Sequence, residues 1–115
     1  MTIQFFFLQR QITLTQRTAL KHFIQEVFKS EGRQLKSLNY IFCSDEYLLQ
    51  INKKHLKHNF YTDIITFNLS ETPVEMIGEI YISIDRVKDN ATQLNVTIKK
   101  ELHRVIFHEI GRAHV

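Results

Sequence analysis

Two apolar segments with the spacing of β-strands, separated by a short loop, most constrain how this chain can fold. Residues 62–68 are rich in β-branched side chains, and residues 77–83 alternate between polar and apolar positions after Gly78. The loop of residues 69–76 holds the only proline, Pro73, a residue that central strands exclude. We therefore expect the two segments to pair as an antiparallel hairpin.

A helix is expected to follow the N-terminal segment. Thr15 is a suitable N-cap, and Gly32 stands where a helix would stop. Between them, apolar residues fall at helical spacing on one face: Leu20, Phe23, Ile24, Val27 and Phe28. We interpret this stripe as core.

Three more helices are predicted. Ser44 can cap a helix that runs to about His55, with acidic residues in its first turn. Ser83 or Asp85 can start a third helix, and Thr97 can cap a fourth.

Residues 2–8 form an apolar run suited to a buried strand, and residues 37–43 are expected to form a second strand. The resulting order is β-α-β-α-β-β-α-α, with one hairpin among helical connections. It predicts an α+β fold in which helices cover a small mixed sheet.

The composition indicates one soluble domain over residues 1–115, which contain 43% hydrophobic residues. The single cysteine, Cys43, lies within an apolar run and is expected to be a buried thiol in a reducing, cytoplasmic environment. The N-terminus resembles neither a signal peptide nor a membrane span. The net charge of +3 is compatible with a polyanionic partner without indicating one.

A basic cluster follows the second predicted helix. Lys53, Lys54 and Lys57, with His55 and His58, could track the phosphates of RNA. A solvated helix face explains the cluster about as well.

Two sites for chemistry can be considered. Asp63 and Glu79 lie on neighbouring predicted strands and could form a carboxylate pair, although the sequence does not fix their separation. His108 and Glu109 begin a His-Glu-x-x-His zinc motif, but Arg112 occupies the second histidine position and has no lone pair for a metal. His108 alone could equally pack at the rim of the core. The catalytic residues stay unassigned.

Several short stretches, taken in order, resemble the YbeY family of metal-dependent endoribonucleases. Ile51-Asn52 is similar to the family's Leu-Asn, and residues 61–67 (YTDIITF) to its Thr-Asp-Val-Leu-Ser-Phe. Residues 77–83 (IGEIYIS) resemble its Leu-Gly-Asp-Ile-x-Ile-Ser strand, and Asn90-Ala91 a helix of the family. Residues 105–108 resemble the start of its His-Gly-x-Leu-His motif.

The resemblance implies a zincin-like fold that binds one zinc ion through three groups, the first of them His108. It also implies hydrolysis of single-stranded RNA near the 3′ end of 16S rRNA, on the small ribosomal subunit, in rRNA maturation and ribosome quality control. Three protein ligands would leave one metal position open for a water.

The chain departs from the family pattern at Leu56, where many members carry arginine, and abruptly at Glu109. Residues 109–115 (EIGRAHV) also match the translation of a common sequencing adapter, and we interpret them as a non-native tail in place of the family's C-terminal end. This chain is therefore expected neither to hold zinc nor to cleave RNA. A non-catalytic RNA-binding or ribosome-binding module is the main alternative, and a zincin-type metalloprotease is a weaker one.

Overall fold

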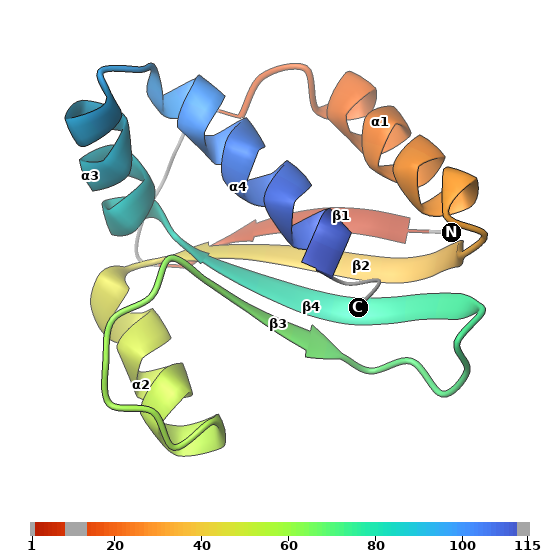
Figure 1. Ribbon diagram of the computed structural model, residues 1–115, viewed down its shortest axis with the longest axis horizontal. Helices are drawn as coiled ribbons and strands as arrows, with labels where there is room; N and C mark the ends of the chain where they lie inside the picture. The colour runs from red at the N-terminus through yellow and green to blue at the C-terminus, as the bar shows by residue number, and fades with distance from the viewer. Residues whose placement is uncertain (1, 9–13, 113–115) are drawn as a thin grey trace.

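The protein is described by a computed structural model that covers residues 2–8 and 14–112, with side chains as far as Phe107. Its elements follow the predicted order and confirm the α+β class (Figure 1). They are β1 (Thr2–Phe7), α1 (Arg17–Ser30), β2 (Gln34–Cys43), α2 (Asp45–His55), β3 (Ile64–Asn68), β4 (Glu75–Ser83), α3 (Ile84–Leu94) and α4 (Ile98–Arg112).

The strands form one mixed sheet in the order β1-β2-β4-β3. β1, β2 and β4 run parallel, while β3 pairs antiparallel with β4, which confirms the predicted hairpin. Gly78 lies where β4 passes closest to β3, because a Cβ there would sit 3.1 Å from the carbonyl oxygen of Phe67.

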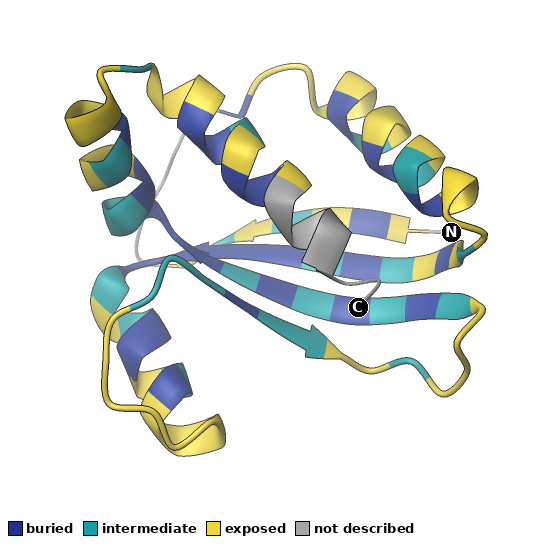
Figure 2. Ribbon diagram, in the orientation of Figure 1, coloured by how far each residue is buried: buried dark blue, intermediate teal, exposed yellow. Residues whose placement is uncertain are grey.

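Helices cover both faces of the sheet, and the alternation along β4 decides which residues meet which layer. Ile80 and Ile82 belong to the main core, beneath α1, α3 and α4. Tyr81 points the other way, into a smaller cluster with Leu48 of α2 and Ile65 of β3. Figure 2 shows the resulting bands of buried and half-buried residues along the strands.

Three of the predicted helix caps are confirmed. The Ser44 hydroxyl accepts from the backbone N–H of Tyr47 at 3.1 Å and the Ser83 hydroxyl from that of Arg86 at 3.1 Å. The Thr97 hydroxyl accepts from the backbone N–H of the residue three positions later at 3.0 Å. Each hydroxyl satisfies a donor that has no partner within the first turn.

The prediction for the start of α1 is wrong. The N-cap is Gln16, in the left-handed conformation with φ 54° and without a side-chain cap bond, instead of Thr15. The apolar stripe of α1 is only partly core: Leu20, Ile24 and Phe28 are buried, but Phe23 is 49% exposed. Phe23 packs against Phe107 of α4, with 4.6 Å between ring centroids.

The expectation of a buried N-terminal strand is also wrong. β1 is an edge strand, so only Ile3 is buried and Phe6 is exposed. By contrast, Cys43 is buried as predicted, and burial raises the pKa of its thiol to about 12. None of the helices in the described part of the chain is both long and apolar enough to cross a bilayer.

Candidate functional site

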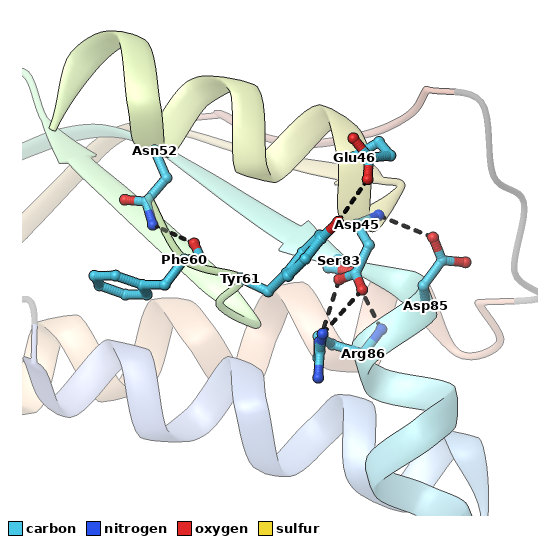
Figure 3. A network of polar contacts seen from close by, with 8 residues as sticks. All are labelled: Asp45, Glu46, Asn52, Phe60, Tyr61, Ser83, Asp85 and Arg86. Carbon is cyan, nitrogen blue, oxygen red and sulfur yellow. Dashed lines mark hydrogen bonds and ion pairs between the residues drawn. The ribbon is translucent and has the colours of Figure 1, made fainter. Parts of the chain in front are cut away.

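The loop that joins α2 to β3, residues 56–63, is fastened by Asn52. This asparagine is 1% exposed, and its Nδ2 donates to the carbonyl of Phe60 at 2.8 Å (Figure 3). Its own backbone carbonyl accepts from the N–H groups of Leu56 at 3.1 Å and His58 at 3.0 Å. One buried residue therefore fixes both ends of the loop's first turn, in which Lys57 adopts a positive φ of 56°.

A second set of polar contacts ties the N-terminal ends of α2 and α3 together. Asp45 Oδ1 accepts from the Ser83 hydroxyl at 2.8 Å, and Asp45 Oδ2 pairs with Arg86 Nη2 at 3.2 Å. Asp85 accepts from the backbone N–H of Asp45 at 2.8 Å. The caps of both helices are thus linked, as Figure 3 shows.

Tyr61 docks the far end of the loop onto this link. Its hydroxyl donates to Glu46 Oε1 at 2.6 Å, and the Arg86 guanidinium lies 5.4 Å from its ring centroid. The hydrogen bond to Glu46 is the main reason that the pKa of Tyr61 is raised. The residues between the two anchors are therefore presented on an ordered backbone.

The predicted basic cluster lies on this part of the molecule. Lys53 and Lys54 are exposed in the last turn of α2, and Lys57 is exposed in the loop that follows. Among the described side chains, none of these lysines takes part in an ion pair. His58 stacks on Phe60 with 5.1 Å between centroids. We call these five residues, Lys53, Lys54, Lys57, His58 and Phe60, the basic-aromatic surface.

The sequence indicated the cations of this surface but not its ring. Phe60 is 55% exposed because the bond from Asn52 holds its backbone carbonyl inward and leaves its side chain outside. A large aromatic residue within the strongly polar stretch of residues 52–63 was the available signal. Leu56 is half exposed at the C-cap of α2, directly before Lys57.

Asp63 and Glu79 do not form the considered carboxylate pair. The carbonyl of Asp63 accepts from the N–H of Ser83, whereas Glu79 lies opposite Phe67. Four residues of β4 therefore separate their positions, about 13 Å along an extended strand. The two carboxylates cannot share a proton or one metal ion at that separation.

α4 carries the candidate metal ligand His108, and its helical backbone continues through Arg112. The side chains of both residues lie outside those described. One turn before His108, Arg104 forms a bidentate pair with Glu101 at 2.7 and 2.6 Å. Glu101 is 1% exposed and also accepts from Asn90 at 3.4 Å. Hydrogen bonding to Arg104 lowers the pKa of Glu101, so this acid is committed to the ion pair.

The residues present do not fit a three-ligand zinc site. Among the side chains described, no group of three or more histidines, cysteines and carboxylates gathers where it could hold a metal. Position 112 supplies a guanidinium, which donates no lone pair. His108 is thus one donor where catalytic zinc requires three.

Desalted protein is accordingly expected to contain far less than one zinc per chain, because a single imidazole cannot hold the ion against dilution. Elemental analysis of the wild type beside His108→Ala tests this. Near-stoichiometric zinc that disappears in the variant would contradict the expectation.

Comparison with known proteins identifies close relatives. A family profile described as "Endoribonuclease YbeY" matches residues 5–114. The Endoribonuclease YbeY of Cytophaga hutchinsonii is 51% identical over 107 residues, which cover 93% of this chain and 75% of that relative. The Endoribonuclease YbeY of Amoebophilus asiaticus is 41% identical, covering 94% of this chain and 74% of the relative. The solution structure of TM1509 from Thermotoga maritima superposes with a TM-score of 0.63 at 28% identity, covering 93% of this chain and 68% of that one.

Proposed function

Because this chain belongs to the YbeY family of endoribonucleases, we propose that its fold binds single-stranded RNA for endonucleolytic cleavage. The RNA is the 3′ region of 16S rRNA on the small ribosomal subunit, and the role is rRNA maturation and quality control. The name that the relatives share supports the nuclease class. The basic-aromatic surface supports the choice of RNA.

That surface carries the proposal because it combines unpaired cations with an accessible ring. Lys53, Lys54 and Lys57 can follow a phosphate backbone, and Phe60 offers a π-face on which a base can stack. Duplex RNA keeps its bases stacked inside the helix, whereas unpaired nucleotides can reach such a ring. The arrangement therefore favours single strands.

Cleavage needs groups that these residues do not supply. In the family reading, zinc held by His108 and two further ligands would provide an activated water and offset the charge on the phosphate. Arg112 stands where the second ligand would be, so no catalytic step is assigned to the residues present. This observation favours a second candidate function for the chain as written, namely RNA or ribosome binding without cleavage.

Changing Lys53, Lys54 and Lys57 together to alanine is expected to weaken binding of a fluorescein-labelled single-stranded oligonucleotide. Each lost phosphate contact releases fewer counterions, so the slope of log K against log salt should fall by about 2 in magnitude. Anisotropy titrations between low and moderate salt measure both effects.

A charge-matched variant separates local contacts from net charge. Lys29, Lys36 and Lys88 are exposed, lie away from the loop of residues 56–63, and remove the same charge when changed to alanine. We expect this control to keep the wild-type salt slope to within roughly half a unit. Equal slopes in the wild type and the Lys53, Lys54 and Lys57 variant would assign those lysines to ordinary solvated surface.

A further inference from the structure

A cavity of about 290 Å3 lies on the α2 side of the sheet, apart from the main core and from α4. Aromatic rings form much of its wall: Tyr81 of β4 stands edge-on to Phe67 of β3, with centroids 5.8 Å apart and planes at 89°. Tyr47 of α2 lies 6.4 Å from Tyr81 in a stacked arrangement. The remaining lining comes from Ile51, His55, Leu69 and Glu79.

Size and chemistry restrict what this cavity can take. Its volume is close to the roughly 300 Å3 at which small-molecule sites begin, which suits one planar group of moderate size. The aromatic wall favours a flat ligand. Glu79 is the only carboxylate among the described lining residues, so polar recognition there consists of accepting N–H donors. Burial first, and then the charge of Glu79, raise the pKa of the Tyr81 hydroxyl, which therefore stays protonated and available as a donor.

We propose that this cavity binds one unpaired guanine base of the RNA, with Glu79 accepting from the base's Watson–Crick edge. Guanine presents N1–H and its amino group side by side, so it can satisfy both oxygens of one carboxylate. Adenine and cytosine offer a single amino group on that edge, and uracil offers a single N–H. The Tyr81 hydroxyl can donate to the guanine O6 or to a sugar oxygen.

The location suits a strand that already lies on the basic-aromatic surface. His55 lines the cavity and belongs to the same last turn of α2 as Lys53 and Lys54. Its ring packs edge-on against Phe67, 5.9 Å away, so the cavity opens beside the cations that would hold the neighbouring phosphates. This inference rests on the proposed function, to which it adds a base preference.

Fluorescein-labelled hexanucleotides of uridine that carry one central guanosine, adenosine or cytidine test the proposal. The wild-type protein should bind the guanosine strand about tenfold more tightly than the other strands, the ratio expected for one good bidentate base contact. Glu79→Gln should reduce that ratio to about one while leaving the all-uridine strand unchanged, because the amide offers only one acceptor.

Glu75→Gln is the matched control, since Glu75 lies on the same strand, outside the cavity, beside Lys36. It should retain the guanosine preference. A wild type without base preference, or a Glu79→Gln variant that keeps the preference, would overturn the proposal while leaving RNA binding intact.

Saturation-transfer NMR with the four nucleoside monophosphates separates this inference from the proposed function. All four ligands share the phosphate, so a signal confined to GMP and lost in Glu79→Gln would support the cavity even if no hexanucleotide bound. That outcome would sink the RNA-binding function alone. Equal signals from all four would overturn the guanine site.

Discussion

Replacing residues 109–115 with Gly-x-Leu-His, a third ligand and a closing helix is expected to give the chain zinc and metal-dependent cleavage of single-stranded RNA. Loss of a mere supporting partner costs metal sites about 10–100-fold, so restoring direct ligands should raise cleavage by about a hundredfold or more. Zinc per chain and cleavage of a labelled oligonucleotide, with and without a chelator, measure the two effects.

The physical reason is the geometry of α4. Its backbone is helical from Ile98 through Arg112, so positions 108 and 112 lie one turn apart on the same face. Two imidazoles there can converge on one ion, and a third group after the glycine can complete the set. Stability should rise too if the new helix covers apolar surface such as the exposed pair Phe23 and Phe107.

The matched control is the same new tail with arginine kept at position 112. It offers the same added surface and differs by one ligand, so it should gain stability without gaining stoichiometric zinc. Equal zinc in both variants would show that the second ligand is not at 112. A repaired chain that loads zinc yet leaves RNA intact, under conditions in which a full-length relative cuts it, would contradict the proposed function and direct attention to Leu56.

Local sequence rules predicted the elements well because the relevant contacts are short. Ser44, Ser83 and Thr97 each bond a backbone N–H three residues later, a pattern visible in the chain itself. The hairpin of β3 and β4 follows from two strand-like segments and a short loop. Thr15 was a poor prediction, because a suitable residue type does not reveal the backbone conformation, and Gln16 takes the left-handed one.

Non-local contacts were out of reach. The separation of Asp63 and Glu79 depends on the strand register, which places Ser83 rather than Glu79 opposite Asp63. The cavity beneath α2 depends on Tyr47, Phe67 and Tyr81 meeting from three elements. Asn52 was noticed as part of a motif, but its work in holding Phe60 appears only when the loop has folded back onto α2.

Asn52→Ala is expected to destabilise the protein by roughly 1–3 kcal/mol, because it leaves a buried carbonyl without its donor and opens a small void. That is a large part of the stability of a typical small domain, which is about 5–15 kcal/mol. RNA binding should weaken as well, since Lys57, His58 and Phe60 would lose their fixed backbone. Denaturant unfolding with Gln50→Ala as an exposed control on the same helix measures the first effect, and this control should stay within about 0.5 kcal/mol of wild type.

Asn52→Asp gives the sharper test, because its effect should depend on pH. The introduced carboxyl would be buried against the Phe60 carbonyl, so its charged form is disfavoured and its folded pKa should exceed the unfolded value of about 3.9. Only the protonated form can donate to that carbonyl. The variant should therefore be closest to wild type below about pH 4 and lose relative stability as the pH rises through the folded pKa. Unfolding of both proteins at pH 4, 5, 6 and 7, about the span over which such a group titrates, measures the difference. A stability gap that does not change with pH would mean that the hydrogen bond from Asn52 to Phe60 does not hold the loop.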